Sequence, residues 1–264
     1  MRGKSIKISK TRRMVMDLLY FAKAVPSIPV QRRINIQAVV AARAACANRP
    51  QWSAIFTRGY AVVAAECPQL RRAYVKLPWP QFYEYPVSTA TIILEREYEG
   101  ERTLFSYLLK GLGSVQELSL AIRHAGTAPV AEIKDFRRAL SLSGLPQGLR
   151  RAMWWLALNI GRQRGNYFGT FGVSVYSALN AESLHPLSPL TTLLNYGVID
   201  GDGNVMVRVI YDHRVLDGGT IARALTRLEE VLNGPVLEEL RSLPRHHQRQ
   251  PKEIPSIVPR PISA

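Results

Sequence analysis

Hydrophobic residues recur along the chain with two different spacings, which predicts a protein of mixed α and β structure. Residues 11–24 suit an amphipathic helix that ends before Pro26, because the residue before a proline disfavours helical geometry. The Ala-rich stretches 34–50 and 52–70 predict two further helices, each closed by a proline. The first half of the chain is therefore expected to be rich in helices.

Shorter alternating runs predict strands at 72–78 and 88–96. Residues 102–110 fit either a helix or a strand, and we assign them to a strand. The glycine-rich run 165–179 predicts a strand whose backbone is closely approached by another part of the molecule. Residues 190–200 and 204–213 flank Gly-Asp-Gly, which predicts a β-hairpin.

Helix signals account for most of the remaining chain. Ser114 and Glu117 form a capping box that predicts a helix to about Ala125, and further helices are expected near 130–142 and 147–162. A last helix is predicted from about 219 to 232, ending at Asn-Gly. We divide the chain into a catalytic domain over 1–243 and a loosely held, basic, Pro-rich tail over 244–264.

The charge is concentrated at the two ends. The formal net charge is +15, of which +6 lies in residues 1–13 and +4 in residues 241–264. Such ends attract anionic partners, namely cofactor phosphates, an acidic carrier protein or a membrane surface, although a solvated tail that aids solubility explains them equally well. Nucleic acid is not expected as a partner, because zinc-finger spacing, a basic zipper and an aromatic RNA-binding signature are all missing.

The remaining composition excludes several classes of protein. Cys46 and Cys67 are too few for a disulfide framework or a metal-ligand cluster, and we expect buried thiols in helices and no metal. No run of 18 apolar residues suggests a membrane span. The basic start loosely imitates a signal peptide, but Asp17 and Lys23 interrupt the apolar run, and we expect a cytoplasmic protein.

One short stretch carries candidate chemistry. Residues 211–219 read YDHRVLDGG and directly follow the alternating run of the second hairpin strand. A strand that ends in a polar turn before a helix explains this stretch. A general base held at a strand end explains it as well, because a neutral imidazole accepts protons near neutral pH.

The stretch DHRVLDG resembles the D-H-R-x-x-D-G motif of 2-oxo-acid dehydrogenase acyltransferases and is similar to the H-H-x-x-x-D-G motif of chloramphenicol acetyltransferase. Residues 169–199 look like that family's G-T-F-T-I-S-N-L-G segment and the strand after it. Residues 11–30 resemble its first helix and the extended stretch that follows. Residues 34–51 and 61–75 resemble its helical core more weakly. The likeness spans roughly 8–240 and is strong only in the last third.

The resemblance implies a two-layer α/β sandwich of the chloramphenicol acetyltransferase-like fold, with a mostly antiparallel mixed sheet. It implies that His213 is the general base and that Ser174 bonds the tetrahedral oxyanion. Asp217 would be structural and would pair with an arginine of the N-terminal region, for which Arg12 is the best match and Arg13 the alternative. Ser174 as a plain strand serine and Asp217 as a helix cap remain open.

The resemblance also implies a homotrimer whose active sites lie between subunits. The donor would be an acyl thioester on coenzyme A or an acyl carrier protein, with no permanently bound cofactor. Since the likeness begins near residue 8, we expect no lipoyl domain and hence a stand-alone enzyme. The family's T-I-S-N-L-G is replaced by Gly-Val-Ser-Val-Tyr-Ser at 172–177, which leaves the substrate open.

Two other classes of function remain open at this point. The chain could be a catalytically idle trimeric scaffold, although the intact His213 and Asp217 argue against that. It could also be a basic protein that binds a membrane or a carrier through its termini, although the body of the chain is only mildly basic.

Overall fold

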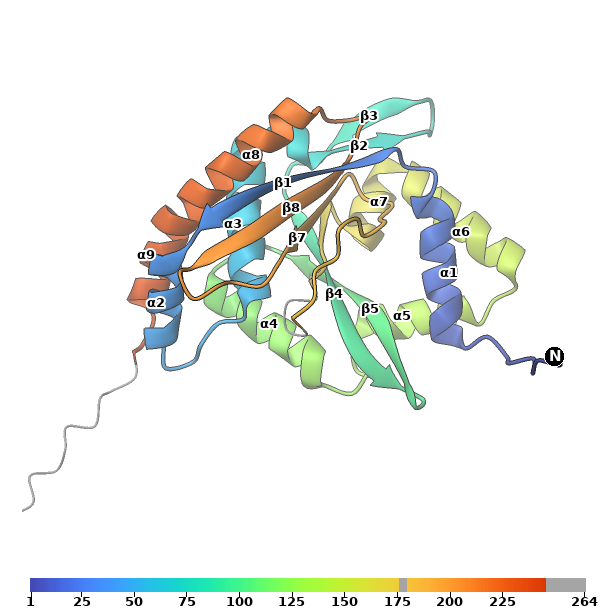
Figure 1. Cartoon of the computed structure of the whole chain (residues 1–264). Helices are drawn as coiled ribbons and strands as arrows, with labels where there is room; N and C mark the ends of the chain where they lie inside the picture. Colours follow the sequence, from blue (N-terminus) through green and yellow to red (C-terminus); the bar gives the residue numbers. More distant parts are fainter. Residues whose placement is uncertain (176–179, 246–264) are drawn as a thin grey trace, which may run out of the picture.

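The computed structural model describes residues 1–175 and 180–245. Its main element is a six-stranded sheet in the order β1-β8-β7-β6-β4-β5 (Figure 1). The strands are β1 (Ser27–Asn35), β4 (Thr89–Tyr98), β5 (Glu101–Lys110), β6 (Phe171–Val173), β7 (Thr192–Tyr196) and β8 (Asn204–Asp212). A separate hairpin consists of β2 (Arg72–Val75) and β3 (Gln81–Glu84).

The sheet is mixed, as predicted. Strands β1 and β8, β7 and β8, and β4 and β5 pair antiparallel, whereas the short β6 pairs parallel with both β4 and β7. The predicted hairpin is formed by β7 and β8, and Gly203 at its turn has a φ of 76°, a backbone conformation that favours glycine. The carboxyl end of β8 lies beside the start of β1, where Ser27 faces Asp212.

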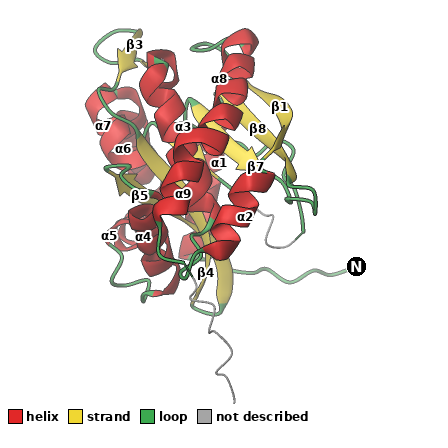
Figure 2. Cartoon of the chain, turned by 90° about the vertical axis from the view of Figure 1, so that its left-hand side faces the viewer, coloured by secondary structure: helices red, strands yellow, loops and turns green. Residues whose placement is uncertain are grey.

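Helices form the second layer. They are α1 (Lys10–Ala22), α2 (Gln37–Ala45), α3 (Trp52–Glu66), α4 (Val115–Thr127), α5 (Lys134–Ser143), α6 (Gln147–Asn159), α7 (Gly161–Phe168), α8 (Gly218–Val231) and α9 (Leu237–Ser242). Figure 2 shows α2, α3, α8 and α9 together on one side, in front of the sheet, whereas α1 and α6 lie at the opposite end of the molecule in Figure 1. The predicted two-layer α/β architecture is therefore confirmed.

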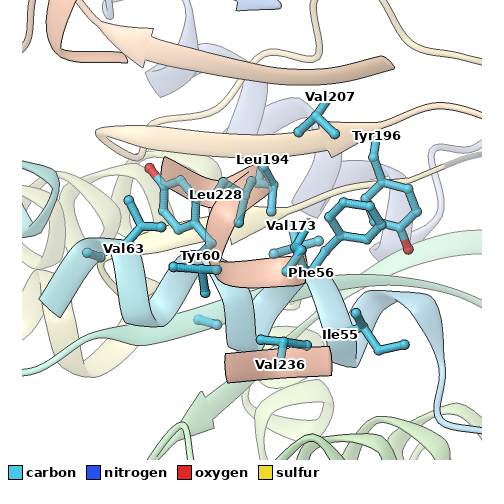
Figure 3. Packing of buried hydrophobic residues seen from close by; sticks show 14 of the residues in the cluster. Ile55, Phe56, Tyr60, Val63, Val173, Leu194, Tyr196, Val207, Leu228 and Val236 are labelled. Carbon is cyan, nitrogen blue, oxygen red and sulfur yellow. The ribbon is translucent and has the colours of Figure 1, made fainter. Parts of the chain in front are cut away.

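The main core lies between the sheet and the helices α3 and α8 (Figure 3). Phe56 on α3 stacks on Tyr196 of β7 with ring centroids 4.0 Å apart, and Tyr60 lies 4.7 Å from Phe171 of β6. These four side chains are at most 3% exposed. Aromatic pairs of this kind add about 1 kcal/mol each beyond the burial of their area.

Several predicted elements are present with nearly the predicted bounds. Ser114 caps α4 through the predicted capping box, in which its hydroxyl accepts from the Glu117 backbone while the Glu117 carboxylate accepts from the Ser114 backbone. The stretch 102–110 is a strand, as assigned. The last predicted helix, α8, ends at Val231, just before Asn233-Gly234, and the backbone at Gly234 is not helical. After this kinked turn (Leu232–Val236) a further short helix, α9, follows, which the sequence did not predict.

The glycine-rich run 165–179 is not a strand over its length. Residues 161–168 form α7, and only Phe171–Val173 are extended, whereas residues 176–179 lie outside the described residues. The predicted close approach is present on the strand, where a Cβ at Gly172 of β6 would come within 2.6 Å of Leu193. It is also present on the helix: a side chain at Gly161 would collide with Tyr83, and a Cβ at Gly165 would come within 2.6 Å of the Tyr85 ring. Gly161 and Gly165 therefore let α7 pack tightly against the β2–β3 hairpin.

Helix α1 is attached to α6 by a buried ion pair. Asp17, which is fully buried, accepts from Arg150 with both carboxylate oxygens and from Arg151 at 3.4 Å. Phe21 stacks on Trp154 with centroids 5.9 Å apart. Because removal of one partner leaves an unpaired charge in the interior, this pair ties the N-terminal helix firmly to α6.

Candidate active site

His213 is the first residue after β8, and the backbone on both sides of it is anchored. Its N–H donates to the carbonyl of Pro26 at 3.0 Å, and the N–H of Asp212 donates to Thr191 at 2.8 Å. The imidazole is half-exposed, and its ring meets that of Tyr211 edge-on at 5.7 Å. The strand end thus presents a positioned imidazole to solvent.

The tautomer of His213 follows from one contact. Nδ1 lies 2.9 Å from the carbonyl oxygen of Leu216. A carbonyl oxygen only accepts, so in the neutral ring Nδ1 must carry the hydrogen and Nε2 must carry the lone pair. The turn that follows β8 therefore holds the exposed imidazole in the form in which Nε2 can accept a proton.

Asp217 does not act as a relay for His213 in this structure. Its carboxylate lies 3.9 Å from Nδ1, too far for a hydrogen bond, and the side chain is 88% exposed. It occupies the N-cap position of α8 without making a side-chain cap bond. Asp217 can still attract the imidazole when the imidazole is protonated, but this attraction is weak because both groups are exposed to water.

The predicted ion pair between Asp217 and Arg12 or Arg13 is not formed within one chain. Arg12 contacts Glu101 at 3.5 Å instead, and in residues 1–175 and 180–245 no arginine lies within 4 Å of the Asp217 carboxylate. The reason is geometric: both arginines lie in the first turn of α1, whereas it is the other end of this helix that leads into β1 and the neighbourhood of His213 (Figure 1).

The loop of His213 is held by a different ion pair. The fully buried Asp212 accepts from the Arg214 backbone at 3.0 Å and from its guanidinium at 2.9 and 2.7 Å. The Arg214 guanidinium also lies 4.7 Å from the centre of the Tyr74 ring, which links the loop to β2. The two charged neighbours of His213 thus restrain its backbone from both sides, a role that sequence reasoning assigned to Asp217.

A second arginine lies behind this loop. Arg164 of α7 is buried and donates to the carbonyl of Pro189 at 2.8 Å. Burial lowers the pKa of Arg164, while the nearby Tyr85 and Asp212 oppose that change. Nothing in the sequence indicated Arg164, because its position depends on how α7 packs.

Ser174 lies directly after β6 and is also buried. Its N–H donates to Leu194 at 3.1 Å, and its carbonyl accepts from the fully buried Asn195 at 2.6 Å. Asn195 is next to Arg208, whose guanidinium contacts the Asn195 side-chain oxygen at 3.4 Å and the Ser183 carbonyl at 2.7 Å. Ser174 is therefore fixed in a polar strip across the middle strands.

The structure does not bring Ser174 and His213 together within one chain. The register pairs Val173 with Leu194 and Leu194 with Val209, so Ser174 stands level with Arg208, five residues before His213. Strand geometry then separates the two residues by about 16 Å along the sheet and roughly 10 Å across it. Ser174 and His213 of one chain are therefore too far apart to contact the same small group.

Within residues 1–175 and 180–245, no group of three or more His, Cys, Asp or Glu side chains is placed to hold a metal ion. Cys46 is buried and Cys67 half-buried, and each lies just after the last residue of its helix.

Comparison with known proteins shows similarity in structure. No family model matches the chain, and no curated protein matches it. A dihydrolipoamide acetyltransferase from Azotobacter vinelandii, studied for the role of a serine, a histidine and an asparagine in catalysis, superposes with a TM-score of 0.63 at 13% identity, over 89% of this chain and 93% of that one.

Two further solved structures extend the similarity. The catalytic core of a 2-oxoacid dehydrogenase multienzyme complex from Thermoplasma acidophilum has a TM-score of 0.63 at 16% identity, with 88% and 99% of the two chains covered. A chloramphenicol acetyltransferase has a TM-score of 0.50 at 13% identity, over 83% of this chain and 94% of that one. The chain therefore has the fold shared by the catalytic cores of dihydrolipoamide acetyltransferases and by chloramphenicol acetyltransferase.

Proposed function

We propose that the protein is an acyltransferase that uses His213 as its general base. The donor is an acyl thioester of coenzyme A or of an acyl carrier protein, and the acceptor is a hydroxyl, an amine or a thiol. The observation that carries the proposal is the contact between His213 Nδ1 and the Leu216 carbonyl, because it leaves Nε2 free to accept a proton.

The reaction proceeds by direct transfer. Nε2 takes the proton of the acceptor while the acceptor heteroatom attacks the thioester carbonyl. The tetrahedral oxyanion receives a hydrogen bond from the Ser174 hydroxyl, a contact worth about 3 kcal/mol of barrier. The carbon–sulfur bond then breaks, and the departing thiolate takes the proton from Nε2. The step balances without a metal or a bound cofactor.

The site assembles between subunits in this proposal. Ser174 and His213 are too far apart in one chain to contact the same tetrahedral carbon, so the Ser174 of one subunit serves the His213 of the next. The similar core from Thermoplasma belongs to a multienzyme complex, which supports an assembled form. A homotrimer, or a multiple of one, is the arrangement we propose.

The Azotobacter enzyme supports the same assignment of residues. Its histidine and asparagine are four positions apart, as are His213 and Asp217 here, and a serine precedes them. We take this asparagine as the counterpart of Asp217, which implies that a negative charge at that position is not required for the reaction in that fold. We assign Asp217 a minor electrostatic role.

The test is thiol release from acyl-coenzyme A and acyl carrier protein by purified protein with a panel of alcohol, amine and thiol acceptors. His213→Ala should lower kcat by about 10²–10⁴-fold. His124→Ala, an exposed histidine on α4, is the matched control and should leave kcat unchanged. Equal loss in both variants, or activity of His213→Ala within tenfold of wild type, would remove His213 from its role. A wild type that transfers to no acceptor would favour an idle scaffold.

A further inference from the structure

The outer surface of α6 leaves apolar side chains without cover. Leu149, Met153, Leu156 and Ile160 follow one another at intervals of four, three and four residues and are 38–53% exposed. This spacing places them in one stripe along the helix. Only Arg150 and Leu158 of α6 are buried, so α6 uses little of its surface to pack against the protein.

Helix α1 extends this apolar surface. Its residues Met16, Leu19 and Tyr20 are 40–50% exposed, and they lie next to α6 because the Arg151 guanidinium is 3.9 Å from the centre of the Tyr20 ring. We call the surface made by the two helices the α1/α6 face. Its members are Met16, Leu19, Tyr20, Leu149, Met153, Leu156 and Ile160.

The charge of the two helices of the α1/α6 face is mainly positive. They carry Lys10, Arg12, Arg13, Arg150 and Arg151, of which Arg150 and Arg151 pair with the buried Asp17 and Arg12 pairs with Glu101 of β5. The preceding segment adds three exposed basic residues and two exposed isoleucines, namely Arg2, Lys4, Lys7, Ile6 and Ile8. In Figure 1 this segment leaves the molecule at the end where α1 and α6 lie.

An open cavity lies within this basic surface. It has a volume of about 350 Å³ and is lined by Arg13, Arg150, Arg151 and Asp17 together with the apolar Ile8, Met16 and Leu145. Because Arg150 and Arg151 pair with Asp17, Arg13 is the lining arginine that we assign to an anionic ligand.

We propose that the α1/α6 face docks on an anionic phospholipid bilayer, with the apolar stripe in the interface and the basic residues on lipid phosphates. Burial of apolar side chains in the membrane interface and attraction of basic residues to anionic lipids both favour such binding, and the two contributions add. No helix of the described ranges is long and apolar enough to cross a membrane, so the contact is peripheral. Two copies packed face to face would bring like charges together, which disfavours a symmetric protein contact.

The test is flotation of the full-length protein with vesicles of phosphatidylcholine alone or with about one third phosphatidylglycerol. The wild type should bind the anionic vesicles and lose binding as salt is raised. Leu149→Glu combined with Met153→Glu should weaken binding by at least about tenfold. Leu120→Glu is the matched control, since Leu120 is 59% exposed on α4, and should bind like wild type.

A second variant tests whether the positive charge is needed for vesicle binding while the fold is unchanged. Lys4→Glu combined with Lys7→Glu should weaken binding to anionic vesicles by more than about tenfold, while circular dichroism and thermal melting stay unchanged. The proposal is overturned if the wild type does not bind anionic vesicles. It is also overturned if the variant with Leu149→Glu and Met153→Glu binds them as tightly as the wild type. Sedimentation in which the stripe variant only lowers the oligomeric state would assign the face to self-association instead. This inference does not depend on the proposed chemistry, since vesicle binding is measured without turnover.

Discussion

The proposed shared site predicts that two inactive variants restore each other. His213→Ala and Ser174→Ala would be co-expressed with different affinity tags, and trimers that contain both would be isolated by two successive purifications. Each variant alone forms only defective sites. In a mixed trimer, a site formed by the His213 of a Ser174→Ala subunit and the Ser174 of a His213→Ala subunit is intact.

The structure sets the expected magnitude. Ser174 and His213 of one chain are separated by about 16 Å along the sheet and roughly 10 Å across it, whereas both must come within about 3 Å of one reacting carbonyl group. One chain therefore cannot complete a site. In a cyclic trimer with one or two copies of each variant, one interface in three pairs the intact residues, so about one third of wild-type kcat should return.

Thiol release from the acyl thioester, with the best acceptor found for the wild type, measures the recovery. The single variants should lie at least about a hundredfold below wild type, which leaves a wide window for the mixed trimers. A mixture of Ser174→Ala with the double variant contains no intact pair and serves as the control. Mixed trimers that stay at the level of the single variants would refute the shared site.

Two other predictions concern the loop of His213. Asp217→Asn should lower kcat less than about tenfold and leave the melting temperature unchanged, because the carboxylate is exposed and makes no hydrogen bond to the imidazole; a loss above a hundredfold would show a relay through Asp217. Arg214→Gln should destabilise the protein by about 3 kcal/mol in urea unfolding and reduce kcat, since it leaves the Asp212 carboxylate buried and unpaired; an unchanged urea midpoint would show that the pair does not restrain the loop.

Local signals in the sequence determined many of the elements. Prolines ended α1 and α3 near the predicted positions, Ser114 and Glu117 began α4, and the Gly-rich turn at 201–203 joined β7 to β8. These features depend on interactions within a few residues, which a single sequence displays directly. For the same reason the order of residues around His213 was enough to place the candidate base at a strand end.

Packing decided what local signals could not. The run at 165–179 looked like a glycine-rich strand, but Gly161 and Gly165 allow α7 to contact Tyr83 and Tyr85, so residues 165–168 are helical and only Phe171–Val173 form a strand. The short helix α9 follows the kink at Gly234 and was not predicted from local signals, and its Leu237 and Leu240 are buried in the main core. At α7 and at α9 tertiary contacts outweigh a local propensity of about 1 kcal/mol.

The candidate site shows the same difference between what local sequence determines and what tertiary structure determines. The sequence determined the order of Ser174, His213 and Asp217 along the chain, but their distances depend on strand register, which only long-range pairing sets. Register places Ser174 level with Arg208 in the middle of β8 and His213 beyond its end, and helix orientation separates Arg12 and Arg13 from Asp217. The ion pair between Asp212 and Arg214 was not predicted, because only the tertiary structure shows that the Asp212 carboxylate is buried. A buried charge needs a partner, whereas the same charge at the surface is solvated by water.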